Sequence, residues 1–135
     1  MVSTSGLNTS GSKIKLTLLL DPGEPLIWCD EEQIRQVFVN LAANALDAIP
    51  TEGFLDISTR VVEDMVEIKF TDTGVGIPEE QLEKVFDAFF TTKSEDRGSG
   101  IGLASSRMTV ERHQGTITVV SRVGEGTIVT VVLPV

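Results

Sequence analysis

The chain has 135 residues, of which 41% are hydrophobic and 23% are charged, a composition typical of one globular domain rather than a disordered chain. Its formal net charge of −9 disfavours binding to nucleic acid or to an anionic membrane surface. The single cysteine, Cys29, excludes an internal disulfide and a cysteine-only zinc site.

The first residues, 1–12, are small and polar, and we interpret them as a linker or a cloning remnant ahead of one domain over residues 13–135. No apolar run approaches the roughly 18–20 residues of a membrane span, and no secretory leader pattern opens the chain. We therefore expect a cytoplasmic domain without direct membrane contact. Such a domain can still belong to a membrane-anchored parent protein.

The hydrophobic pattern changes its period several times along the chain. Residues 13–21 are predicted to form a strand, and residues 28–49 a long amphipathic helix. Asp30 is the expected N-cap of this helix, with Gln33 placed as in a capping box, and Pro50 ends it. The further expected elements are a hairpin of strands 54–61 and 65–72, a loop over 73–102 with a short helix at 79–86, a helix at 103–114, and a hairpin of strands 116–123 and 126–135.

This order of elements predicts an α+β fold. We expect a two-layer sandwich, in which a mixed, mostly antiparallel sheet is covered on one face by about three helices. The loop over residues 73–102 is long for a compact domain, and such loops are usually binding segments or lids.

Three polar residues of the long helix share one face, because Asn40, Asn44 and Asp47 are spaced four and three residues apart. One interpretation is a solvated polar stripe. The other is a divalent-cation site, since a carboxamide oxygen is a hard ligand and Mg²⁺ takes its remaining ligands from water and substrate phosphates.

The segment DTGVGIP (72–78) follows a predicted strand. Asp72 ends that strand, and Gly74 and Gly76 follow at alternate positions. The segment is either an ordinary turn or a place where a planar ligand approaches the backbone closely. In the second case the Asp72 carboxylate can accept a hydrogen bond from an exocyclic amine.

The segment GSGIGL (98–103) directly precedes the predicted helix at 103–114. Its glycines indicate either a flexible entry to the helix or an anion-binding cradle, with Lys93 and Arg97 as nearby cations. A Walker A loop is excluded, because no G-K-[ST] follows. The segment FDAFFTTK (86–93) holds three of the chain's six phenylalanines, which indicates a hydrophobic anchor or a pin for a lid over a ligand.

Taken in order, NLAANALDA, DTGVGIP, FDAFFTTK and GSGIGL resemble the N, G1, F and G2 boxes of one family. It is the catalytic ATP-binding domain of sensor histidine kinases, which shares the GHKL or Bergerat fold with gyrase, MutL proteins and heat-shock chaperone ATPases. The resemblance covers roughly residues 16–132. NALDA and FFTTK are most similar to the nitrogen-regulation type of sensor kinase.

The resemblance implies a role for each matched residue. Asn44 would bind Mg²⁺ with Asn40 beside it near the phosphates, and Asp72 would accept the adenine amino group. Asp47 is expected at the pocket rim, and Phe86–Gly102 would form the nucleotide lid. The further residues implied to contact the nucleotide are Gly74, Gly76, Ile77, Phe86, Lys93, Arg97, Gly98, Ser99, Gly100, Ile101, Gly102 and Leu103.

Asn40 also separates branches of the group that the resemblance identifies. The hydrolysing relatives have Glu at this position, whereas a carboxamide cannot act as a general base. The resemblance therefore favours transfer of the ATP γ-phosphate to a histidine on a separate, upstream dimerisation domain. His113 lies at a predicted helix end, and we interpret it as structural.

We therefore expect a monomer that binds ATP, ADP and Mg²⁺, does not phosphorylate itself, and meets a response regulator only indirectly, through the phosphorelay of its parent. Two other functions stay open on the sequence alone. One is a protein-serine kinase or an ATPase of the same group, and the other is a non-catalytic nucleotide-binding module. An upstream helix carrying H-E-x-x-N/T-P would decide for the histidine kinase.

Overall fold

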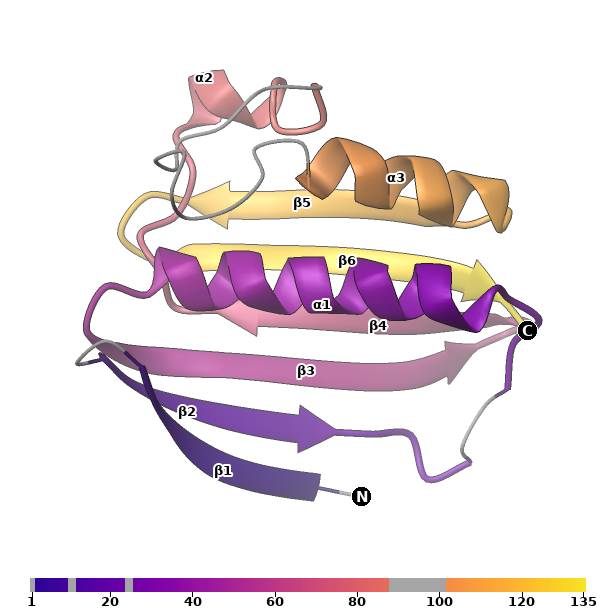
Figure 1. Cartoon of the computed structure of the whole chain (residues 1–135), viewed down its shortest axis with the longest axis horizontal. Helices are drawn as coiled ribbons and strands as arrows, with labels where there is room; N and C mark the ends of the chain where they lie inside the picture. Colours follow the sequence, from indigo (N-terminus) through magenta and orange to yellow (C-terminus); the bar gives the residue numbers. More distant parts are fainter. Residues whose placement is uncertain (1, 10–11, 24–25, 88–101) are drawn as a thin grey trace.

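The computed structural model describes residues 2–9, 12–23, 26–87 and 102–135. Within them, the strands are β1 (Val2–Thr9), β2 (Ser12–Leu19), β3 (Glu52–Val62), β4 (Met65–Asp72), β5 (Thr116–Arg122) and β6 (Gly126–Pro134). They form one sheet in the order β1-β2-β3-β4-β6-β5 (Figure 1). β2 and β3 run parallel, and the other neighbouring strands are antiparallel.

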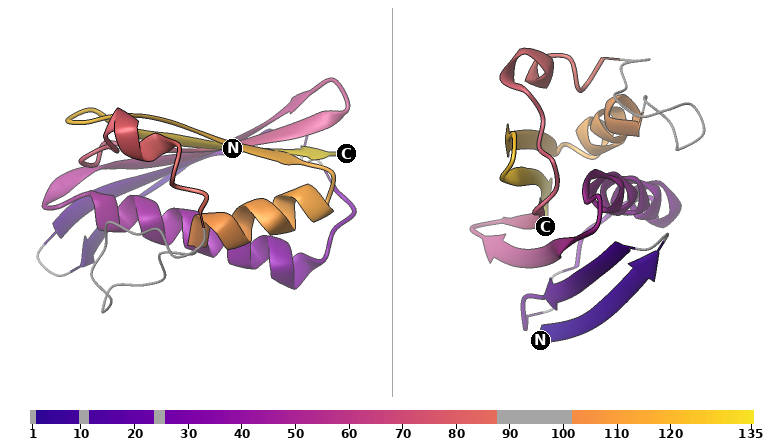
Figure 2. Two further views of the ribbon diagram at one scale, coloured as in Figure 1. Left: turned by 90° about the horizontal axis from the view of Figure 1, so that it is seen from above. Right: turned by 90° about the vertical axis from the view of Figure 1, so that its left-hand side faces the viewer.

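Two helices, α1 (Glu31–Ala48) and α3 (Gly102–Arg112), lie side by side on one face of this sheet (Figure 2). The short helix α2 (Glu79–Leu82) lies beside the outer strand β5 (Figure 1). It is shorter than the predicted helix at 79–86, and no side chain caps its first turn. The arrangement confirms the predicted α+β sandwich with a mixed, mostly antiparallel sheet.

The beginning of the chain differs from the sequence-based expectation. Val2–Thr9, interpreted as part of a linker, forms β1 and pairs along its whole length with β2. Sheet ladders are made by backbone groups, so a strand of small polar residues can pair without the apolar alternation that sequence patterns detect. The place where the natural domain begins stays a prediction.

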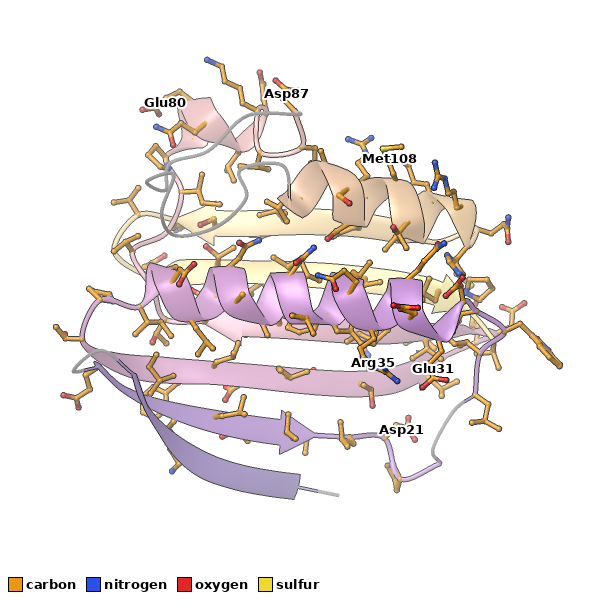
Figure 3. All side chains as sticks on the ribbon, viewed as in Figure 1. Asp21, Glu31, Arg35, Glu80, Asp87 and Met108 are labelled. Carbon is orange, nitrogen blue, oxygen red and sulfur yellow. The ribbon has the colours of Figure 1, made fainter. Side chains whose placement is uncertain are left out.

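Helix α1 is defined by its N-cap and its apolar face. Asp30 accepts a hydrogen bond from the backbone N–H of Gln33 at 3.1 Å, as predicted. The other half of the expected capping box is replaced, because the Asp30 backbone N–H donates to Nε2 of His113 instead. On the solvent side of the first turns, Glu31 and Arg35 form an exposed ion pair (Figure 3).

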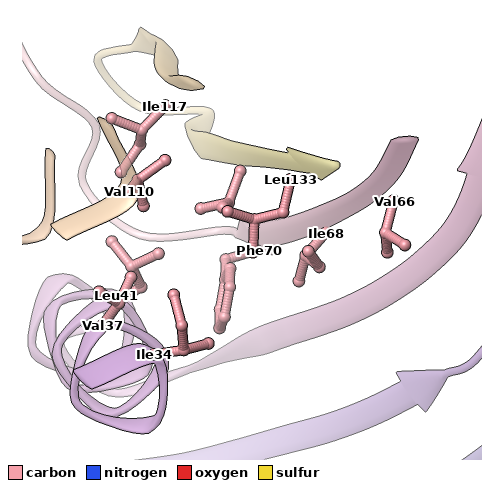
Figure 4. Packing of buried hydrophobic residues seen from close by; sticks show 10 residues of the cluster. Ile34, Val37, Leu41, Val66, Ile68, Phe70, Val110, Ile117 and Leu133 are labelled. Atoms are coloured by element: carbon pink, nitrogen blue, oxygen red, sulfur yellow. The ribbon is translucent and has the colours of Figure 1, made fainter. Parts of the chain in front are cut away.

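The core lies between the helices and the central strands (Figure 4). Alternate residues of β4 are buried, and the Phe70 ring lies 5.9 Å from the ring of Phe38 on α1. This alternation places every second residue of β4 on the helix-covered face. The buried members of this cluster are Ile34, Val37, Leu41, Val66, Ile68, Phe70, Val110, Ile117, Val131 and Leu133.

Candidate functional site

The helix-covered face of the sheet becomes polar at one end. There, Ser121 on β5 is the cross-strand partner of Thr127 on β6, and Thr127 is the partner of Asp72 on β4. On the same face, the next row toward the centre of the sheet is wholly apolar and consists of Val119, Val129, Phe70 and Ile57. The register that builds the core therefore also places Asp72 on the same face, at the end where α1 finishes.

Asp72 is a buried carboxylate, with 6% of its surface exposed. Its Oδ1 accepts a hydrogen bond from the backbone N–H of Gly74 at 2.8 Å. Burial raises the pKa of Asp72, and backbone N–H groups of Gly74 and Thr127 oppose this change. An ionised carboxylate has acceptor positions for about four hydrogen bonds, so Asp72 can also accept one from a ligand.

The glycines that follow Asp72 are required by close backbone packing. A Cβ at Gly74 would lie 2.6 Å from the carbonyl oxygen of Ala48, at the end of α1. A Cβ at Gly76, whose φ is 78°, would lie 2.1 Å from the carbonyl oxygen of Arg122. The sequence suggested that these glycines admit a ligand, and the structure shows that their near neighbours include the backbone of the domain itself.

Backbone hydrogen bonds hold this glycine loop from two sides. The Val75 N–H donates to the carbonyl oxygen of Ala48 at 2.9 Å, and the Gly124 N–H donates to the carbonyl oxygen of Val75 at 2.9 Å. The Ile77 N–H donates to the hydroxyl oxygen of Ser121 at 2.8 Å. The loop is thus connected both to the C-terminus of α1 and to the turn between β5 and β6.

The predicted polar face lies on the C-terminal half of α1. Asn40 and Asn44 are half-buried, whereas Asp47 is exposed. The Asn40 Oδ1 accepts a hydrogen bond from Nε2 of Gln36 at 3.1 Å. Because Ala48 contacts Gly74, this half of α1 is the part of the helix nearest the Asp72 loop.

The described residues contain no group of three His, Cys, Asp or Glu side chains that could hold a metal ion. The polar face of α1 suits a different kind of metal site. Asn44 offers one carboxamide oxygen, and Mg²⁺ accepts such sites when substrate phosphates and water complete its ligands. The donor set therefore fits Mg²⁺ that arrives with a nucleotide.

Phe86 is half-buried and packs against the core cluster. The guanidinium of Arg107 on α3 lies 5.1 Å from the centre of its ring, and Arg107 also pairs with Glu111 at 3.4 Å. These contacts agree with the predicted hydrophobic anchor. Leu103 packs against the same cluster, and Gly102 is the first residue of α3. Lys93, Arg97, Gly98, Ser99, Gly100 and Ile101 lie outside the described residues.

A second group of residues around Asp72 was not predicted from the sequence. Ser121, Thr127 and Gly126 belong to the β5–β6 hairpin, for which the sequence pattern predicted no role in a site. Yet a Cβ at Gly126, whose φ is 128°, would lie 2.0 Å from the carbonyl oxygen of Asp72. The glycines of the β5–β6 turn can be read from the sequence, but only the strand register places this turn beside β4.

His113 lies at the opposite end of the domain, where α3 ends and α1 begins (Figure 1). Its Nε2 accepts the backbone N–H of Asp30 at 3.1 Å. The Nδ1 atom therefore carries the proton and donates to the carbonyl oxygen of Thr109 at 2.7 Å. Both ring nitrogens are engaged within the fold, which agrees with a structural role.

The chain matches the family described as histidine kinase-, DNA gyrase B- and HSP90-like ATPases over residues 29–135, and it belongs to this family. It is 37% identical over 129 residues to sporulation kinase E of Bacillus subtilis (strain 168). It is 38% identical over 128 residues to the sensor histidine kinase ZraS of Escherichia coli (strain K12). Each alignment covers 95% of this chain but only 17% and 27%, respectively, of those relatives.

Solved structures show the same fold. A mycobacterial sensor histidine kinase, MprB, superposes with a TM-score of 0.79 at 27% identity, over 90% of this chain and 81% of that one. The nucleotide-free catalytic domain of the histidine kinase ThkA gives a TM-score of 0.79 at 32% identity, over 90% and 78% of the two chains. These matches confirm an ATP-binding domain of the histidine kinase class, while the nitrogen-regulation subtype stays a prediction.

No helix in the described part of the chain is long and apolar enough to cross a membrane.

Proposed function

We propose that this chain binds Mg-ATP and presents the γ-phosphate to a histidine on a separate dimerisation domain of its parent protein. The observation that carries the proposal is the buried Asp72 carboxylate, placed at the polar end of the sheet beside the C-terminal half of α1. A buried acceptor with a raised pKa is typical of a ligand site rather than of a stabilising ion pair.

In this proposal, Asp72 accepts a hydrogen bond from the exocyclic amine of adenine. Asn44 contributes its carboxamide oxygen to Mg²⁺, and Asn40 lies one turn away, near the phosphates. Bound Mg²⁺ neutralises part of the phosphate charge. The residues of this chain bind and orient the nucleotide, which is the main contribution that phosphoryl transfer requires from a protein.

Two features favour transfer to a separate acceptor. Asn40 stands where a hydrolysing enzyme of this fold would need a general base, and a carboxamide does not titrate in the required range. His113 has both ring nitrogens hydrogen-bonded at the far end of the domain. We therefore propose that the acceptor histidine belongs to an upstream helical domain and that a response regulator receives the phosphoryl group later. The ATP-binding domain by itself is proposed to be a monomer.

Calorimetric titration with ATP, with and without Mg²⁺, tests the proposal. The wild-type chain should bind saturably, and Asp72→Asn should weaken binding roughly 10- to 100-fold, because an amide nitrogen replaces one acceptor of a charged hydrogen bond. Asp56→Asn is a matched control, since Asp56 is an exposed aspartate of β3. Binding by Asp72→Asn that equals the wild type would contradict the assigned pocket.

Incubation with radiolabelled ATP tests the second half of the proposal. The chain alone should take up no stable label, whereas an added dimerisation domain with its acceptor histidine should become labelled. Stable label on His113 would overturn this assignment. Rapid release of inorganic phosphate by the chain alone would instead favour an ATPase.

A further inference from the structure

Ser121 lies at the centre of a hydrogen-bond cluster that joins the β5–β6 turn to the Asp72 loop. Its hydroxyl oxygen accepts the backbone N–H of Ile77 at 2.8 Å. The same hydroxyl donates to the carbonyl oxygen of Gly126 at 2.9 Å and lies 2.7 Å from the hydroxyl oxygen of Thr127. A serine has one hydroxyl proton, so Thr127 is the donor in the contact between the two hydroxyls.

The partners of Ser121 are themselves held against Asp72. Thr127 is the cross-strand partner of Asp72, and its backbone N–H is one of the groups that oppose the burial effect on the Asp72 pKa. Gly126 packs on the carbonyl oxygen of Asp72, at a distance that excludes a Cβ. The β5–β6 turn therefore fixes one side of the carboxylate and, through Ser121, the chain that follows it.

Ile77 marks the point where the glycine loop leaves the turn. The preceding residue, Gly76, lies against the backbone of Arg122, and both Ile77 and Ser121 are half-buried. Without the serine hydroxyl, the Ile77 N–H would lose its acceptor in a place of restricted access to water. The loop would then keep its backbone packing and the backbone hydrogen bonds of Val75, but it would lose its contact with the Ser121 side chain.

We infer that Ser121 is a positioning residue of the nucleotide site, which acts through Ile77 and Thr127 to hold the Asp72 loop around the adenine base. The inference rests on the proposed function, because it assumes that the base lies against Asp72. It assigns the β5–β6 turn to the base end of the pocket and separates this end from the phosphate end on α1.

The inference predicts a specific pattern of affinities. Ser121→Ala should weaken ATP and ADP binding by the same factor, about tenfold, and the factor should not change when Mg²⁺ is removed. Asn44→Ala, at the phosphate end, should instead weaken ATP mainly when Mg²⁺ is present. Ser121→Thr keeps a hydroxyl and suits a strand, so it should restore most of the lost affinity.

Thr118→Ala is the matched control. Thr118 lies three residues earlier on β5 and is exposed, and nothing places it at the pocket. It should bind ATP and ADP like the wild type. Thermal unfolding of each variant, followed by circular dichroism, restricts the comparison to chains that fold.

The outcomes separate the two proposals. A wild-type chain that binds no adenine nucleotide would overturn the proposed function and this inference with it. Normal wild-type binding together with unchanged binding by Ser121→Ala would overturn the inference alone, as would a loss confined to ATP with Mg²⁺. If Ser121→Ala does not fold, hydrogen exchange on the wild type decides. The Ile77 amide should be protected in the wild type, and it should stay protected in folded Ser121→Thr. Rapid exchange of this amide in the folded wild type would also overturn the inference.

Discussion

The two ends of the domain use the same type of group, an aspartate carboxylate, in opposite ways. At the end where α1 begins, Asp21 accepts the backbone N–H groups of Gly23 and Val61, at 2.8 and 3.0 Å (Figure 3). These hydrogen bonds lower the pKa of Asp21. At the end where α1 finishes, burial raises the pKa of Asp72. The fold favours the ionised form of the Asp21 carboxylate, whereas burial disfavours the ionised form of the Asp72 carboxylate.

The same contrast extends to the neighbours of each aspartate. Around Asp21 and His113, side chains complete backbone hydrogen bonds that join the β2–α1 connection and the end of α3 to the rest of the domain. Around Asp72, glycines allow backbones to approach so closely that no side chain fits. The first end fixes the layers together, and the second end holds the buried carboxylate that we propose as the acceptor for a ligand. If the proposed function is correct, nucleotide binding depends on the Asp72 end of α1 and not on the end at His113.

The largest effect is expected at the glycine beside Asp72. Gly126→Ala should lower the free energy of unfolding by about 3 kcal/mol, because its φ of 128° is strained for alanine and the new Cβ would meet the carbonyl oxygen of Asp72. Urea unfolding measures the change. Gly124→Ala is the matched control: its φ is 82°, but no atom lies within 4 Å of the added Cβ, so about 1 kcal/mol is expected. Equal losses of unfolding free energy in the two variants would show that the contact between Gly126 and the backbone of β4 does not contribute to stability.

A smaller effect is expected at the opposite end. His113→Ala should lower the free energy of unfolding by about 1 kcal/mol, because the Asp30 N–H loses its acceptor, while ATP affinity should change little. Glu111→Ala, which removes only an exposed ion pair with Arg107, should cost less than about 0.5 kcal/mol. If His113→Ala weakened ATP binding strongly in a stably folded chain, the separation of the two ends would not hold.

The smallest expected effect is a difference between Asp21 and Asp72 in how each contributes to stability as the pH changes. The folded-state pKa of Asp21 is lowered, so its contribution to stability is present above its ordinary value of 3.8 and is lost as the pH falls through the folded pKa. Asp21→Asn should therefore be less stable than the wild type at neutral pH, and the difference should shrink on acidification. The measurement is urea unfolding between pH 3 and 7.

Asp72 should behave with the opposite sign. Its folded-state pKa is raised, so ionisation counts against the folded chain as the pH rises above 3.8. Asp72→Asn should consequently be at least as stable as the wild type at neutral pH, with the difference vanishing in acid. A marked loss of stability in this variant at pH 7 would mean that the Asp72 charge stabilises the fold, as the Asp21 charge does.

Much of the site follows from local sequence spacing. Asn40 and Asn44 share a face because the helical period is 3.6 residues, and Asp72 faces the helices because β4 alternates with a period of two. The N-cap at Asp30 and the break at Pro50 are likewise local signals, and they delimit α1 to within a few residues of the prediction. Each of these features depends on residues fewer than five positions apart, so the sequence by itself determined them.

Tertiary structure decided the contacts between distant segments. The acceptor for the Asp30 N–H is His113 rather than Gln33, and the polar row joins Ser121, Thr127 and Asp72 across three strands. The pairing of β1 with β2 could not be predicted from the sequence pattern either, because its ladder is made by backbone groups, which do not depend on side-chain type. Strand register and helix packing are set by the total burial of the core rather than by any one segment, which is why these partners appear only when the chain is folded.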